Sequence, residues 1–70
     1  MDVLTVDALG LRCPLPVLRL RKRMADLPAG AEVELLADDP AALIDVPHFC
    51  AEAGHEYLGS AGTTHRLRKR

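Results

Sequence analysis

The chain has 70 residues, a formal net charge of -1 at pH 7 and 49% hydrophobic residues. This length allows one small domain, and because only 3% of the residues are aromatic, the core must consist mainly of aliphatic side chains. No apolar run reaches the length of a membrane span, and the N-terminal residues lack the basic start of a secretion signal. Two cysteines are also too few for a secreted disulfide framework. We therefore expect a single domain over residues 1–70, located in the cytoplasm with both thiols reduced.

Apolar periodicity and turn residues predict six elements in chain order. The β-branched stretch 3–7 predicts a strand, and residues 14–27 predict a helix, opened by a proline and ended by "LPAG". Residues 31–37 alternate between apolar and acidic, which predicts a strand with one exposed face. After a helical segment over 39–54, residues 55–70 predict a hairpin around "SAGT".

The second helical segment contains its own start, stop and break signals. Asp39 is expected as its N-cap and Pro40 as its first helical residue, and Gly54 is expected to end it. Pro47 lies inside the segment and removes a backbone donor, so we expect a kink or restart near Asp45, which would cap the restarted helix.

The order strand, helix, strand, helix, strand, strand predicts an α+β fold. Because the alternating strand leaves one face of the sheet exposed to water, we expect two layers rather than three. The sequence therefore predicts a two-layer βαβαββ sandwich, in which both helices cover one face of a four-stranded mixed sheet.

Cys13 lies in "GLRCPLP", just before the first predicted helix. Unpaired N–H groups and the helix dipole stabilise an anion there and lower the pKa of a thiol, and Arg12 adds a positive charge. Gly10 allows a tight turn from the strand, Pro14 directs the chain into the helix, and Pro16 removes a competing N–H donor. These residues favour an exposed thiolate nucleophile at position 13.

The residues alone leave a second interpretation open, because free cysteines are often small buried apolar side chains. A thioredoxin-type dithiol is not expected, since Pro16 occupies the position of the second cysteine. Cys50, between Phe49 and Ala51, is expected to be a core thiol, with a resolving role toward Cys13 as the alternative. For Asp45 the alternative to capping is orienting the loop near Cys13.

A metal site is not expected, because no pair of ligands has the close, repeated spacing of structural zinc sites. His48 and Cys50 are two residues apart and would point to different faces of a helix. We expect His55 and His65 to be surface residues.

All basic residues fall into two clusters, one within 12–23 and one within 66–70. If the first helix and the last strand are neighbours, one side of the protein is positive, and the alternative is a solvated helix face plus a basic tail. RNA binding is one use of such a patch, but no aromatic residues are interleaved with the basic ones. We therefore expect no direct nucleic-acid binding, and we interpret Arg19, Lys22 and Arg23 as a docking surface for acidic partner proteins.

The segment "LGLRCPLPV" resembles the signature of the TusA family of small sulfur-carrier proteins, also called SirA-like, whose hallmark is a Cys-Pro-x-Pro motif that opens the first helix. "ADDPA" at 37–41, "DVPHFC" at 45–50 and "GHEYL" at 54–58 are also similar to that family, in the same order and spacing. The resemblance covers nearly the whole chain, and it implies the same βαβαββ fold.

The resemblance further implies that Cys13 accepts sulfane sulfur as a persulfide from a cysteine desulfurase or a rhodanese and passes it to the cysteine of a downstream carrier. The cargo would serve tRNA 2-thiolation, molybdenum-cofactor synthesis or sulfur oxidation. No cofactor is expected on this chain, since pyridoxal phosphate belongs to the donor desulfurase. A carrier that visits several partners is expected to be a monomer. The alternatives are a non-catalytic interaction domain or an RNA-binding module with the same fold, neither of which would need Cys13.

Overall fold

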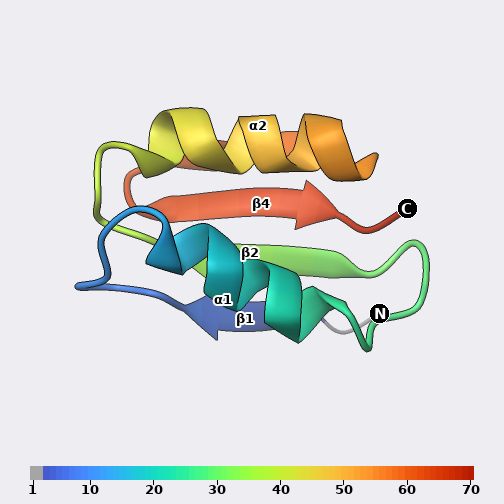
Figure 1. The fold of residues 1–70 in the computed structure, drawn as a ribbon. Coiled ribbons are helices and arrows are strands. Elements are labelled where there is room, and N and C mark those ends of the chain that lie inside the picture. Colours follow the sequence, from blue (N-terminus) through green and yellow to red (C-terminus); the bar gives the residue numbers. More distant parts are fainter. Residues whose placement is uncertain (1–2) are drawn as a thin grey trace.

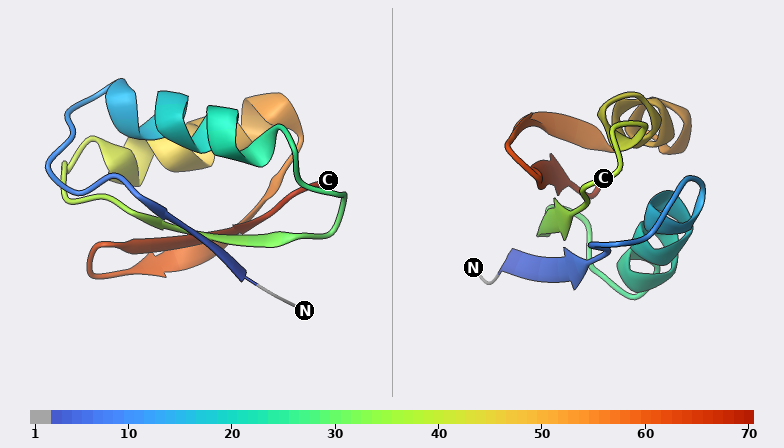
Figure 2. Two further views of the ribbon diagram at one scale, coloured as in Figure 1. Left: turned by 90° about the horizontal axis from the view of Figure 1, so that it is seen from below. Right: turned by 90° about the vertical axis from the view of Figure 1, so that its left-hand side faces the viewer.

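The computed structural model describes residues 3–70 and contains six elements in the predicted order (Figure 1). They are β1 (Val3–Asp7), α1 (Leu15–Met24), β2 (Glu32–Leu36), α2 (Ala42–Ala53), β3 (Glu56–Ala61) and β4 (Thr64–Arg68). The strands lie in the order β1-β2-β4-β3, with β1 and β2 parallel and β4 antiparallel to both of its neighbours. Both helices cover the same face of the sheet (Figure 2), so the predicted two-layer α+β fold is confirmed.

The core lies between the sheet and the two helices. Val33 and Leu35 of β2 are fully buried, while the two glutamates that alternate with them are only partly covered. The helices bury side chains at helical spacing against these strands, namely Pro16, Leu20 and Met24 of α1 and Ala42, Val46, Phe49 and Cys50 of α2. No helix within residues 3–70 is long and apolar enough to cross a membrane.

The open face of the sheet carries ion pairs between strands. Arg66 lies 3.4 Å from Glu34, and Arg68 lies 3.2 Å from Glu56. Such exposed pairs contribute about 0–1 kcal/mol each, but they keep this face solvated. Arg66 and Arg68 are therefore paired with glutamates on the open face instead of joining the basic side chains of α1, so the last strand and the first helix do not form the single positive side considered from the sequence.

Lys69 caps the C-terminal end of α1 from the opposite end of the chain. Its Nζ donates hydrogen bonds of 2.8 Å to the carbonyl oxygen of Met24 and 2.6 Å to that of Leu27. Carbonyl groups in the last turn of a helix have no partner within the helix, and the negative end of the helix dipole attracts a cation. The C-terminal segment thus holds α1 in place.

The start of α2 differs from the prediction. Asp39 precedes the helix by three residues, and its Oδ1 accepts a 3.1 Å hydrogen bond from the N–H of Ala41, which occupies the N-cap position. Pro47 lies within one continuous helix, so the helix does not restart near Asp45 and Asp45 is not its N-cap. The missing hydrogen bond would have gone to the carbonyl of Leu43, which lies on an exposed turn where water can replace it. As predicted, Gly54 follows the last helical residue, and its φ of 79° is in the left-handed region.

His65 is buried rather than exposed, with 1% of its surface accessible. It lies on β4 opposite Leu35, on the core side of the sheet, and its Nδ1 is 3.1 Å from the hydroxyl oxygen of Tyr57. Burial lowers the pKa of His65 because it disfavours the charged imidazolium. The polar partner explains why a core position accepts histidine.

Replacing Lys69 with methionine should lower the free energy of unfolding by about 1–2 kcal/mol, because it removes the charged donor from the end of α1. Urea denaturation measures this loss. Lys22→Met removes a charge from the same end of α1 without removing these hydrogen bonds, and it should cost about 0.5 kcal/mol or less. Equal losses in the two variants would contradict the capping role.

The free energy of unfolding should decrease as the pH falls below about 7.5. In this range the unfolded chain protonates His65 near its ordinary pKa of 6.5, while the folded protein, with its lowered pKa, still excludes the proton. His55, whose pKa is lowered by burial and by Lys69, contributes in the same direction. Urea titrations at about pH 7.5, 6.5 and 5.5, which span about one unit on either side of the ordinary pKa, give the free energy of unfolding at each pH. This free energy should change less with pH in His65→Gln than in wild type. An unchanged pH dependence in His65→Gln would exclude His65 as the cause.

Candidate functional site

Cys13 lies in the loop that joins β1 to α1, and it is exposed. Two carboxylates that follow β2 hold the backbone of this loop. The N–H of Gly10 donates a 3.0 Å hydrogen bond to Asp38 Oδ1, and the N–H of Cys13 donates a 2.8 Å hydrogen bond to Asp39 Oδ2. The thiol is thus positioned by residues that lie far along the sequence.

Gly10 is required by its backbone conformation rather than by close packing. Its φ is +80°, in the left-handed region, while a Cβ at this position would meet no atom within 4 Å. The tight turn predicted at Gly10 is therefore present, and its amide reaches Asp38.

The two prolines of the motif take different positions at the start of α1. Pro14 occupies the N-cap position after a cis Cys13–Pro14 peptide bond, and Pro16 is buried in the first turn. The carbonyl of Arg12 accepts a 2.8 Å hydrogen bond from the N–H of Leu15, the first helical residue. Cys13 therefore lies two residues before the helix.

The pKa of Cys13 is raised rather than lowered. The largest cause is a hydrogen bond from the thiol to the side chain of Asp45, followed by desolvation and by the negative charges of Asp45 and Asp39. The sequence analysis weighed the helix terminus and Arg12, which are local. It missed two carboxylates that the fold brings from α2 and from the loop before it. The predicted low-pKa thiolate is therefore wrong for the free protein.

Arg12 acts on Asp39. Hydrogen bonds from the N–H groups of Cys13 and Ala41 hold the pKa of Asp39 below its usual value, and the charge of Arg12 adds to this effect. The carboxylate therefore stays ionised and keeps its hold on the Cys13 backbone across the neutral pH range.

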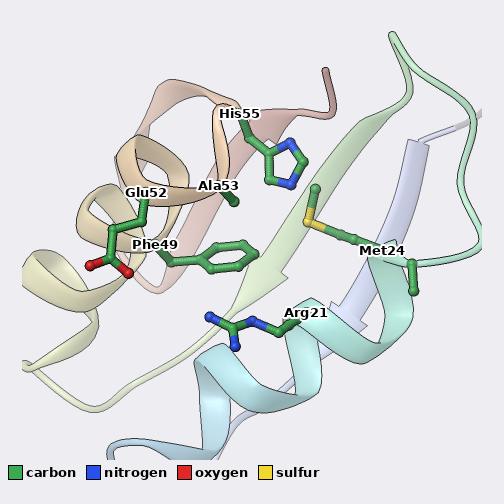
Figure 3. A pocket seen from close by; sticks show the side chains of 7 residues that line it. Arg21, Met24, Phe49, Glu52, Ala53 and His55 are labelled. Atoms are coloured by element: carbon green, nitrogen blue, oxygen red, sulfur yellow. The ribbon is translucent and has the colours of Figure 1, made fainter.

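A groove between α1 and α2 begins at Cys13. Its first part has a volume of about 180 Å³ and is lined by Cys13, Pro14, Val17, Arg21, Asp45, His48, Phe49 and Glu52. A second hollow of about 400 Å³ shares Arg21, Phe49 and Glu52 with the first and extends to His55. In Figure 3, Arg21 and Met24 on α1 face Phe49 on α2, with Glu52 beside them and His55 at the far end. The two hollows therefore form one groove that leads away from the thiol.

Sequence reasoning treated Arg21 only as one member of a basic cluster. In the structure its guanidinium carbon lies 5.4 Å from the centre of the Phe49 ring, on the wall of the groove. The spacing contained a signal, because positions 14, 17 and 21 share one face of α1 and positions 45, 48 and 52 share one face of α2. Which helix faces meet follows only from the fold.

Cys50 is buried on the core side of α2, with 1% of its surface accessible. Burial raises the pKa of its thiol to about 11, so it stays protonated at neutral pH. The prediction of a core thiol is confirmed. A resolving role would need Cys50 to leave the core to reach the exposed Cys13.

The residues predicted to dock partners lie on the exposed side of α1, but they are not equivalent. Arg19 donates a 2.9 Å hydrogen bond to the carbonyl oxygen of Asp7 and so ties α1 to the end of β1. Lys22 and Arg23 are exposed, and no hydrogen bond or ion pair engages their side chains within residues 3–70. In the same part of the chain, no group of three acidic, histidine or cysteine side chains could hold a metal ion.

Comparison with known proteins places these features in a family. Residues 4–69 match the sequence profile of the family described as "Sulfurtransferase TusA". The chain is 47% identical over 62 residues to the "Sulfur carrier protein TusA" of Pseudomonas entomophila (strain L48), covering 84% of this chain and 78% of that protein. The crystal structure of a SirA-like protein from Desulfitobacterium hafniense matches with a TM-score of 0.70 and 32% sequence identity, covering 94% of this chain and 92% of that one.

Asp45→Asn should lower the pKa of Cys13, because it replaces the carboxylate that accepts the hydrogen bond of the thiol with a neutral amide and so removes a negative charge beside the thiol. The rate of alkylation by iodoacetamide, measured against pH, reports this pKa, and its midpoint should move to lower pH in the variant. Glu52→Gln is the matched control, because it removes a carboxylate from the same groove that does not act on the thiol. An unchanged midpoint in Asp45→Asn would show that Asp45 does not hold the thiol protonated.

Proposed function

The chain belongs to the TusA family of sulfur carriers, and we propose that Cys13 is the residue on which it carries sulfur, as a persulfide. The observation that supports this assignment most directly is the exposure of Cys13 at the mouth of a groove while Cys50 is buried. A sulfur carrier exchanges its cargo with other proteins, so its reactive thiol must enter their active sites. Within residues 3–70, only Cys13 meets this requirement.

The loading step is an exchange between a thiol and a persulfide. The sulfur of Cys13 attacks the outer sulfur of the donor persulfide, a new S–S bond forms at Cys13, and the bond to the donor sulfur breaks. The donor sulfur leaves as a thiolate and takes up the proton that Cys13 loses, so no oxidant or reductant is needed. The Asp45 carboxylate, which accepts the hydrogen bond of the thiol, is placed to receive that proton in transit.

The raised pKa of Cys13 has consequences for both halves of the relay. In the free protein the thiol stays protonated, which protects it from oxidants and alkylating agents. A higher thiol pKa also makes the Cys13 sulfur a poorer leaving group, so the cargo is retained between encounters. A partner that places a positive charge beside Asp45 would reverse both effects when it docks.

The donor in this proposal is a cysteine desulfurase or a rhodanese, and the acceptor is a downstream carrier protein in tRNA thiolation, molybdenum-cofactor synthesis or sulfur oxidation. This chain needs no cofactor of its own, because the pyridoxal phosphate of a desulfurase performs the C–S chemistry on the donor. The proposed carrier is a cytoplasmic monomer. Lys22 and Arg23, with Arg19, offer cations to an acidic partner surface, so association should slow as salt is added.

The composition of the open sheet face favours this proposal over RNA binding. Sheet-based RNA-binding domains stack bases on exposed aromatic side chains. Here the open face carries pairs of glutamate and arginine, while Phe49 is buried and Tyr57 packs against the core.

Incubation with a cysteine desulfurase, pyridoxal phosphate and L-cysteine should add one sulfur atom to the protein, and a reductant should remove it. Intact mass spectrometry measures the gain. Cys13→Ser should show none, whereas the matched variant Cys50→Ala, which also lacks one thiol, should load like wild type. Failure to gain sulfur from several desulfurases and rhodaneses would refute the carrier role of Cys13.

A further inference from the structure

The part of the groove beside Cys13 presents charges of both signs within a small space. Arg21 approaches from α1, whereas Asp45, His48 and Glu52 approach from α2. Its volume of about 180 Å³ is below the range of ~300–1,000 Å³ that is typical for drug-sized ligands. A small ligand therefore fits this site, and a zwitterion complements its charges of both signs.

Arg21 is the cation in this groove that has no anionic partner. Within residues 3–70 it makes a cation–π contact with Phe49, but neither a hydrogen bond nor an ion pair. The contact with the ring holds the guanidinium at the wall of the groove, where its N–H groups have no protein acceptor within residues 3–70. A guanidinium held in this way fits a carboxylate, which it can bind through two parallel hydrogen bonds.

The two carboxylates of the groove, those of Glu52 and Asp45, differ in whether they already form an ion pair. Glu52 lies 3.0 Å from the ring nitrogen of His48, one turn away on α2, so its charge is already engaged. Asp45 is half-buried beside the thiol and has no ion-pair partner within residues 3–70. Arg21 and Asp45, a cation and an anion that form no ion pair within residues 3–70, therefore line the same hollow as the reactive sulfur.

We propose that this groove binds a free amino-acid persulfide, cysteine hydropersulfide, as a small-molecule sulfur donor, with Arg21 holding its α-carboxylate and Asp45 its α-ammonium group. The inference rests on the proposed function, because it takes Cys13 as the acceptor. The sulfur of Cys13 attacks the outer sulfur of the bound persulfide, the S–S bond of the donor breaks, and cysteine leaves as its thiolate. The proton released by Cys13 returns to that thiolate, so the products are the Cys13 persulfide and free cysteine.

The ammonium group of the donor also changes the state of the thiol. Asp45 is the main reason that the pKa of Cys13 is raised, both as an acceptor and as a negative charge. An ammonium group beside Asp45 neutralises that charge and so favours loss of the proton from Cys13. The zwitterionic donor thereby promotes the deprotonation that its own reaction requires, which a donor without the ammonium group cannot do.

The experiment compares three hydropersulfides, those of L-cysteine, N-acetyl-L-cysteine and cysteamine. Each is generated from its symmetrical trisulfide and one equivalent of the parent thiol, which gives one hydropersulfide and one disulfide. The N-acetyl-L-cysteine donor lacks the ammonium group, and the cysteamine donor lacks the carboxylate. Loading of Cys13, followed by quenching and intact mass spectrometry, should be about tenfold faster with the cysteine donor than with either of the others, the effect of one charge-assisted contact.

The variants test whether Arg21 binds the α-carboxylate of the donor. Arg21→Gln should slow loading from cysteine hydropersulfide about tenfold and leave loading from cysteamine hydropersulfide unchanged. Lys22→Gln, the matched control, removes the neighbouring charge of α1 that does not line the groove, and it should load like wild type. Equal rates for the three donors, or equal losses in the two variants, would overturn the small-donor site.

Parallel loading by a cysteine desulfurase separates the two proposals. If the desulfurase loads Cys13 while the three small donors show no preference, the donor site is refuted and the carrier role stands. If neither the desulfurase nor any small donor loads Cys13, both are refuted.

Discussion

Hydrogen bonds between two loops that are distant in sequence determine where the reactive thiol lies. Because β1 and β2 are parallel neighbours, their C-terminal ends lie at the same edge of the sheet, and the loops that follow them are adjacent. Asp38 and Asp39, in the second loop, accept hydrogen bonds from backbone amides of the first. Asp39 also holds the turn that starts α2. One carboxylate thus sets the distance between the starts of the two helices, and with it the mouth of the groove.

The same arrangement sets the protonation of the thiol. A helix terminus favours an anion, but the fold places Asp45 beside Cys13, and Asp39 lies nearby. In this protein the hydrogen bond to Asp45, desolvation and the charges of Asp45 and Asp39 raise the pKa of the Cys13 thiol. The site therefore stores a protonated thiol within reach of an acceptor for its proton, and contact with another molecule can change that state.

Sequence patterns predicted the elements well because each pattern reports a local property. The alternation in β2 and the helical spacing in α1 show which side of each element faces the core. Gly54 marks the end of α2, because it takes up the left-handed conformation that ends a helix. The restart predicted near Asp45 is wrong, because water at the exposed turn around Leu43 can replace the hydrogen bond that Pro47 cannot make. The sequence patterns also placed His65 at the surface, since only the register opposite Leu35, with Tyr57 nearby, shows that it is buried. Within the site, Cys13 and its motif were visible in sequence, whereas the nearness of Asp45 and Arg21 depends on how the helices pack.

The position of β4 has a consequence for how the protein folds. β4 follows β3 in the chain but lies between β3 and β2, so the sheet cannot grow by adding strands in chain order. The β3–β4 hairpin can form locally, but its pairing with β2 joins Val33 to Leu67, and the chain must close a long loop to make that contact. Since both residues are fully buried, the core is completed in the same step. We therefore expect folding to be all-or-none, so that the loop with the thiol is ordered only in molecules whose sheet is already complete.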